Sequence, residues 1–116
     1  MDAFSAASGL EGFIGACLVD SGSGLMLASR GGGPINLEAA AALNSQVVRA
    51  EQQVIETLGT QDRIEDILIT VGKQIHLIRP FEKAPDVFLY LVLEEKAGTF
   101  GLARRQAKSV ETALMT

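Results

Sequence analysis

Short apolar runs alternate with turn residues along most of the chain, and only two long segments repeat their apolar residues at helical spacing. Residues 13–19 and 87–93 are apolar at nearly every position, which is typical of strands covered on both faces of a sheet. Residues 25–28, 62–71 and 74–79 are shorter or less apolar, and turns rich in glycine or proline bound them. The pattern therefore predicts five strands.

Two long segments and one short one are expected to be helical. The longest runs over 36–58, where Asn36 suits the amino-terminal cap and Gly59 suits a left-handed end. A second helix is predicted over 99–114. A short one is predicted over 2–10, where the residues are small and polar. The order is helix, two strands, helix, three strands, helix.

This order predicts the fold class. Each connection between consecutive strands is a short turn, so neighbouring strands should pair antiparallel. The two continuous apolar runs should lie centrally, with helices over both faces. We expect an α+β fold: an α/β/α sandwich with a five-stranded antiparallel sheet, the long helix on one face and the terminal helices on the other. A chain of 116 residues has room for one core, so 1–116 should form a single domain.

The long helix carries two apolar lines that are separated by about 80–100° at 3.6 residues per turn. The first is wholly apolar and is the expected core stripe, with Ala40, Leu43, Val47, Ala50, Val54 and Leu58. The second follows the 4-3 spacing of a helix–helix seam and contains Leu37, Ala41, Asn44, Val48, Glu51 and Ile55. The remaining arc is polar and holds Glu38, Ser45, Gln46, Arg49, Gln52, Gln53 and Glu56.

The second line has two interpretations. It can widen the stripe over the chain's own sheet, as broad apolar helix faces often do. It can instead pack against a second copy of the chain. Asn44 and Glu51 favour the second interpretation, because a polar residue in an apolar seam fixes register and partner at some cost in stability. We therefore expect a homodimer with paired long helices.

Charge and composition exclude several partners. The chain has 14 acidic and 10 basic residues, a net charge of −4, whereas nucleic acid or anionic lipid requires a basic excess. No apolar run approaches the ~20 residues that span a bilayer, and the amino-terminal residues lack the basic start of a signal peptide. We expect a cytoplasmic protein without a nucleic-acid partner and without membrane insertion.

Three consecutive glycines, 31–33, stand between a predicted strand and the long helix, as in phosphate-binding loops. A Walker loop continues from its last glycine into lysine and Ser/Thr, whereas Pro34 and Ile35 follow here. Proline also lacks the N–H that a phosphate cradle would use. The glycines are interpreted as a connector, and no nucleotide cofactor is expected.

Other candidate reactive groups are interpreted as structural. Cys17 and His76 are the only residues of their kinds, too few N and S donors for a zinc site. Cys17 lies in an apolar run without nearby cations, and no nucleophile motif accompanies His76. Glu65 and Asp66 are adjacent on a predicted strand and so point to opposite faces. No catalytic residue and no metal site is expected.

Five stretches carry a family resemblance, namely 15–20, 24–29, 72–79, 87–93 and 101–105. Each is weak alone, but their order and spacing, over roughly residues 10–112, resemble the Roadblock/LC7 family of small regulatory proteins. The resemblance implies a profilin-like sandwich that dimerises through the long helix and the third strand, with one sheet running across two copies.

The third strand adds Ile64 and Ile67 to the expected dimer interface. The resemblance also implies a regulator or platform of a small Ras-like GTPase, without catalytic residues of its own. Pairing of the long helices would display the polar arc twice, and arginine is its strongest hot-spot candidate. The expected partner-binding residues are Gln46, Arg49, Gln53 and Glu56.

A structural adaptor of a signalling or motor complex, indifferent to nucleotide state, is the alternative. Such an adaptor would be tethered through the back of the sheet or through the last helix. The basic residues there are Arg104, Arg105 and Lys108. A run of this kind is usually a solvated face, and its functional interpretation is docking of an acidic partner.

Overall fold

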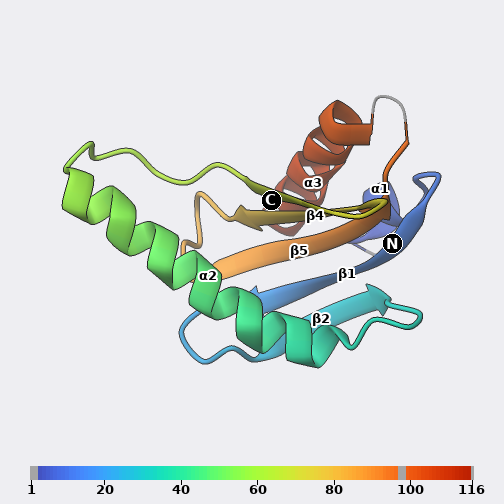
Figure 1. The fold of residues 1–116 in the computed structure, drawn as a ribbon, viewed down its shortest axis with the longest axis horizontal. Coiled ribbons are helices and arrows are strands. Elements are labelled where there is room, and N and C mark those ends of the chain that lie inside the picture. Colours follow the sequence, from blue (N-terminus) through green and yellow to red (C-terminus); the bar gives the residue numbers. More distant parts are fainter. Residues whose placement is uncertain (1–2, 97–98, 116) are drawn as a thin grey trace.

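The computed structural model describes residues 3–96 and 99–115, and this part of the chain is built around one five-stranded sheet (Figure 1). The strand order is β2-β1-β5-β4-β3, and all neighbours pair antiparallel. The strands are β1 (Phe13–Asp20), β2 (Met26–Gly31), β3 (Ile67–Val71), β4 (Gln74–Pro80) and β5 (Val87–Glu94). The helices are α1 (Ser5–Ser8), α2 (Leu37–Leu58) and α3 (Thr99–Met115).

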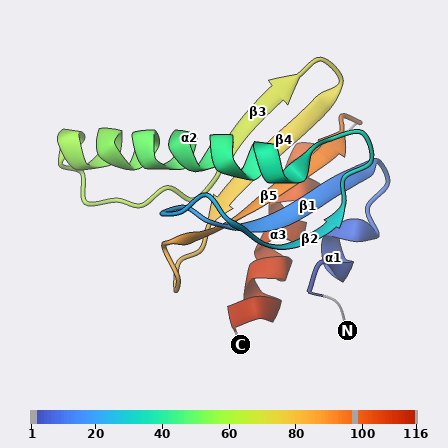
Figure 2. The same cartoon turned by 90° about the horizontal axis from the view of Figure 1, so that it is seen from below.

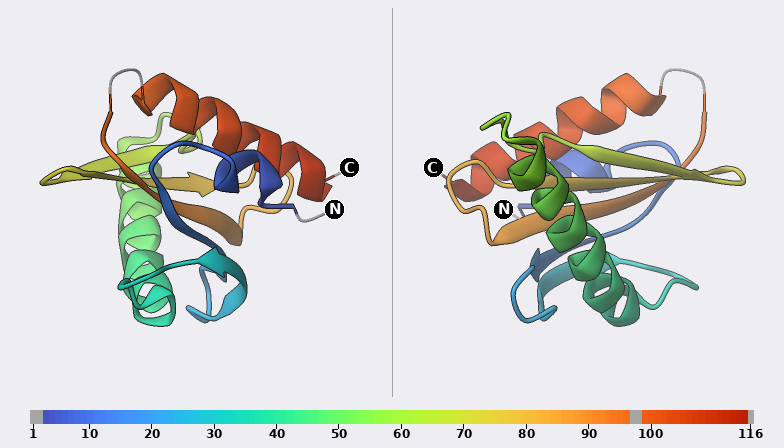
Figure 3. Two further views of the ribbon diagram at one scale, coloured as in Figure 1. Left: turned by 90° about the vertical axis from the view of Figure 1, so that its right-hand side faces the viewer. Right: turned by 60° about the vertical axis from the view of Figure 1, so that its left-hand side comes forward.

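The helices cover the two faces of the sheet as predicted. The long helix α2 lies on one face, and α1 and α3 lie on the other (Figure 3). On the α3 side, Leu77, Leu89 and Leu91 of the sheet pack against Ala107 and Val110. The other side has its own apolar cluster, which is described below. The predicted α+β sandwich, with the order of its elements, is confirmed.

The ends of α2 also agree with the sequence. The Asn36 side chain accepts a hydrogen bond from the backbone N–H of Ala39 at 3.1 Å, and Gly59 ends the helix with φ of 68°. Such caps satisfy backbone groups that the helix itself leaves without partners. The predicted boundaries of this helix are confirmed to within one residue.

Two strand boundaries differ from the prediction by three or more residues. β3 begins at Ile67 instead of residue 62, and it pairs with β4 from Ile67 onward. β2 extends to Gly31, because Gly15 on the neighbouring strand leaves room for the backbone beside it. A Cβ atom at Gly15 would lie 2.8 Å from the Cα of Gly32. Positive φ at Gly31, Gly32 and Gly33 then turns the chain from β2 toward α2.

The predicted assignment of the two apolar lines of α2 is wrong. Leu37, Ala41 and Val48 were expected to face a second copy, but they are buried against the chain's own sheet. Their neighbours there include Cys17 and Tyr90. The alternative interpretation, in which the second line widens the apolar face over the chain's own sheet, describes these residues better.

The stripe expected in the core is largely exposed. Leu43 is 62% exposed, Val54 46% and Leu58 66%. The wholly apolar line is the exposed one, so hydrophobicity alone favoured the wrong line. Ser45 was assigned to the polar arc of α2, but it is buried. Its hydroxyl donates to the carbonyl of Ala41 at 2.8 Å.

The carboxyl-terminal half of α2 extends beyond the sheet. Figure 2 shows the helix crossing β1 and β2 near its start and projecting past the strands at its end. Its contacts with the sheet accordingly fall mainly on β1 and β2. The exposed stripe therefore continues along a part of the helix that the chain's own sheet does not support.

The corrected assignment predicts opposite outcomes for the same substitution at two positions of α2. Val48→Glu should prevent cooperative folding, because a carboxylate would replace a fully buried side chain at a cost of several kcal/mol. Val54→Glu, the matched control on the exposed stripe, should keep a cooperative thermal transition. Circular dichroism during heating measures both. A folded Val48→Glu beside an unfolded Val54→Glu would reverse the assignment.

Candidate functional site

Five residues of α2 form what we call the exposed stripe. They share one side of the helix and face away from the sheet, and they are Leu43, Val47, Ala50, Val54 and Leu58. β3 is the last strand at one edge of the sheet, so its outer backbone groups have no strand partner within the described part of the chain. Leu68 and Val71 on this strand are also exposed. An apolar helix side together with a free strand edge favours association with another chain.

The eight residues predicted for the dimer interface fall into two groups. Leu37, Ala41 and Val48 are buried within the chain, so the prediction is wrong for these three. The other five are at least partly exposed: Asn44, Glu51, Ile55, Ile64 and Ile67. Ile67 packs at the margin of the core below α2.

Gln46, Arg49, Gln53 and Glu56, the predicted partner-binding residues, are all exposed on α2. We call them the polar face. Arg49 has a contact that the sequence did not indicate: its guanidinium donates to the carbonyl oxygens of Ser21 at 2.9 Å and Gly22 at 3.1 Å. The side chain is therefore held against the turn between β1 and β2.

The turn that Arg49 contacts is itself stabilised by hydrogen bonds. The carboxylate of Asp20 accepts from the Ser23 hydroxyl at 2.6 Å and from the Ser23 backbone N–H at 3.3 Å. The hydroxyl contact is the main cause that lowers the pKa of Asp20. This closed turn fixes where Arg49 presents its charge.

His76 belongs to a series of side-chain hydrogen bonds beside α2. The Tyr90 hydroxyl is 2.7 Å from Nδ1, and Oε1 of Gln74 is 3.1 Å from Nε2. Asn44 hydrogen-bonds the same hydroxyl. Burial lowers the pKa of His76 and favours the neutral ring. Both ring nitrogens have partners, so a structural role accounts for this histidine.

Cys17 is fully buried in the cluster below α2. Burial raises the pKa of its thiol to about 12. The group therefore stays protonated at neutral pH and lacks the nucleophilic thiolate. Its place in the core agrees with the interpretation as a small apolar residue.

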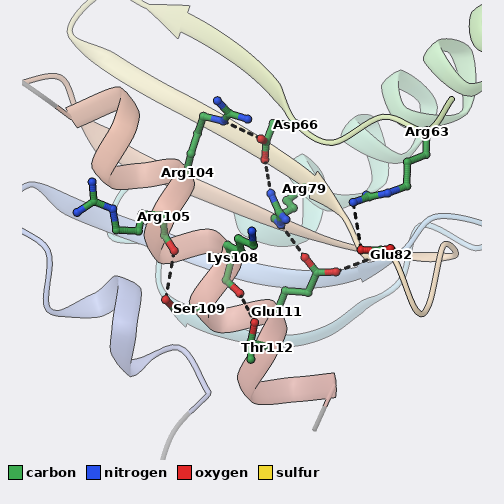
Figure 4. A network of polar contacts seen from close by, with 10 residues as sticks. All are labelled: Arg63, Asp66, Arg79, Glu82, Arg104, Arg105, Lys108, Ser109, Glu111 and Thr112. Carbon is green, nitrogen blue, oxygen red and sulfur yellow. Dashed lines mark hydrogen bonds and ion pairs between the residues drawn. The ribbon is translucent and has the colours of Figure 1, made fainter.

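A buried ion network on the opposite face of the sheet was not foreseen (Figure 4). Arg79 of β4 donates to Glu111 of α3 at 2.7 Å and to Asp66, just before β3, at 3.0 Å. Arg104 donates to the other oxygen of Asp66 at 2.8 Å, and the second oxygen of Glu111 accepts the Glu82 backbone N–H. Burial opposes the charge on Arg79, but Glu111 and Asp66 raise its pKa.

The network changes the interpretation of the basic residues on α3. Arg104 forms an ion pair with Asp66, whereas Arg105 and Lys108 are exposed on the surface of α3. No sequence signal could have revealed the network, since its members are far apart along the chain and belong to different elements.

The described residues contain neither a metal-binding cluster nor a membrane-spanning helix. Among residues 3–96 and 99–115, no cluster of His, Cys, Asp and Glu could hold a metal ion. In the same ranges, no helix combines the length and the apolar character needed to cross a bilayer.

Several solved structures share this fold. MglB of Myxococcus xanthus matches with a TM-score of 0.76 and 19% sequence identity, over 88% of this chain and 74% of that one. A Roadblock/LC7 domain from Streptomyces avermitilis matches with a TM-score of 0.75 and 17% identity, over 100% of this chain and 98% of that one. An MglB with tetrameric arrangement matches with a TM-score of 0.74 and 22% identity, over 90% and 76% of the two chains.

Sequence comparison adds no relative to this set. No protein-family profile matches the chain, and no curated protein matches it. At the identities given above, structural likeness establishes the fold, while function depends on particular sites. The chain has the fold of Roadblock/LC7 domains, and the resemblance noted in its sequence is confirmed at that level.

The buried network predicts a strong dependence of stability on Arg79. Arg79→Leu would leave Glu111, with a side chain only 10% exposed, without a cation, and Asp66, 5% exposed, with Arg104 alone. The variant should cost about 3–5 kcal/mol. Urea denaturation measures the change. The matched control is Arg63→Leu, since the Arg63–Glu82 pair is exposed and should be worth under about 1 kcal/mol. Equal losses in the two variants would contradict this account.

Proposed function

We propose that this chain is a single-domain member of the Roadblock/LC7 family that forms a homodimer and modulates a small Ras-like GTPase without chemistry of its own. The sequence stretches, the shared fold and the exposed stripe of α2 support this proposal. The exposed stripe is the main support for this proposal, because no other part of the described chain covers its apolar side chains.

A second copy is the occupant that fits best. Its own exposed stripe would cover this one in a symmetric contact, which is the commonest arrangement in homodimers. Removing the apolar side chains from water would contribute about 25 cal/mol per Å² of apolar area. The free edges of β3 in the two copies could pair at the same time, and this would satisfy backbone groups that otherwise favour aggregation.

Dimerisation of this kind would leave the polar face free. On the helical wheel, Gln46, Arg49, Gln53 and Glu56 lie along one flank of α2, centred roughly 120° away from the exposed stripe. Two copies would thus present two such faces to a partner. Arginine and glutamine side chains with partly fixed geometry suit protein recognition, and arginine is enriched among hot spots.

A nucleotide-indifferent adaptor remains the second candidate, and one observation favours it. Arg105 and Lys108 are exposed on α3, on the face of the sheet opposite α2, where they could dock an acidic partner. This surface lies apart from the polar face, so substitutions can separate the two functions.

Capture of a small GTPase tests the proposal. A small Ras-like GTPase from the same organism would be loaded with GDP or with a GTP analogue, and its affinity for the immobilised chain measured. We expect a preference for one nucleotide state. Gln46→Ala with Gln53→Ala should weaken binding by about tenfold, the loss of roughly 1.4 kcal/mol at the interface. Arg49→Ala should act in the same direction.

The matched control for this experiment is Arg105→Ala with Lys108→Ala, which changes exposed side chains on the other face. Under the proposal these two substitutions leave capture unchanged. Equal capture of both nucleotide states, or a loss confined to the Arg105 and Lys108 variant, would support the adaptor instead.

A further inference from the structure

A pocket of about 340 Å³ lies between the end of α2, the connection from residue 59 to residue 66, and the turn between β4 and β5. Ile55, Ile64 and Phe81 contribute its apolar surface. The volume is near the lower end of the roughly 300–1,000 Å³ that ligand pockets occupy. It therefore suits one long side chain better than a large cofactor.

The polar lining of the pocket is mainly acidic. Glu56, Asp62 and Glu82 contribute carboxylates, and Arg63 is the cation among the lining residues. Arg63 is paired with Glu82 at 3.3 Å (Figure 4). Across the described ranges of the chain, no hydrogen bond or ion pair is formed by the carboxylates of Glu56 and Asp62. The lining thus carries an excess of negative charge that the chain does not neutralise.

We propose that this pocket binds an arginine side chain of the partner protein. The alkyl part of arginine would lie against Ile55 and Ile64, and the guanidinium would meet Glu56 and Asp62. A planar guanidinium forms directional, charge-assisted hydrogen bonds with carboxylates, which favours arginine over lysine. A lining that combines apolar side chains with the carboxylates of Glu56 and Asp62 is complementary to this side chain.

The position of the pocket connects it to the polar face. Glu56 belongs to both, so the inference rests on the proposed function and specifies one contact of its partner site. The exposed stripe lies on the other side of α2, as the helical positions of Val54 and Glu56 show. A second copy packed on the stripe would therefore leave the pocket open to a different protein.

The test uses N-acetyl-arginine methylamide as the probe, so it does not depend on the GTPase. Methyl NMR spectra of the full chain, labelled at isoleucine, would follow a titration with this compound. We expect saturable shifts at the methyls of Ile55 and Ile64. The citrulline analogue, which has the same shape but no charge, should bind about tenfold more weakly because the charge-assisted hydrogen bonds are lost.

Glu56→Gln with Asp62→Asn should abolish the response to the arginine probe. The matched control is Glu38→Gln with Glu51→Gln, which removes two exposed carboxylates of α2 outside the pocket and should leave the response unchanged. The absence of shifts in the wild-type chain would overturn the inference. Equal binding of the citrulline analogue would overturn it too.

Comparison with GTPase capture separates this inference from the proposed function. Binding of the arginine probe without any capture would leave the pocket assignment standing and refute the GTPase partner. Capture that is unaffected by Glu56→Gln with Asp62→Asn would refute the pocket as a partner contact. A lower molar mass of that variant in light scattering would assign the pocket to a second copy and would equally overturn the inference.

Discussion

The rotation of α2 about its axis is the constraint on which the rest of the structure depends. It is set where Leu37, Ala41 and Val48 meet the sheet and where Ser45 satisfies its hydroxyl within the helix. Once these positions are buried, the helical period decides the rest. The apolar stripe ending at Leu58 must face away from the sheet, and the polar face must lie along one flank of the helix, between the stripe and the sheet.

A second constraint is the ion network that connects the residue before the edge strand β3 to α3, on the face of the sheet opposite α2. Asp66 directly precedes β3, and its two oxygens are held by Arg79 and Arg104, while Glu111 holds Arg79 from α3. These charges would be costly to bury if they had no partners, but each carboxylate is paired. Among the described residues, no buried side-chain polar atom lacks a hydrogen-bond partner. The network therefore positions the start of the edge strand on which the proposed dimer contact relies.

Much of the fold could be predicted from the sequence, but less of the candidate site could. Continuous apolar runs identified β1 and β5 as central strands, and Asn36 and Gly59 marked the ends of α2, because these signals are local. The choice between two apolar lines on one helix was not local. It depended on which line met the apolar face of the sheet and on Asn44 reaching the Tyr90 hydroxyl, whereas the partner of Ser45 lies within the helix itself. The ion network around Arg79 and the acidic pocket at Glu56 join residues distant in sequence, which no spacing pattern could reveal.

The central claim is that the exposed stripe of α2 is covered by a second copy of the chain. The most direct measurement is an isotope-filtered NOE experiment on an equimolar mixture of ¹³C-labelled and unlabelled protein, which detects only contacts between copies. The account predicts intermolecular NOEs at the methyls of Leu43, Val54 and Leu58. The account would be contradicted if these methyls gave none, or if the only intermolecular NOEs came from Leu25 and Leu27 at the other edge of the sheet.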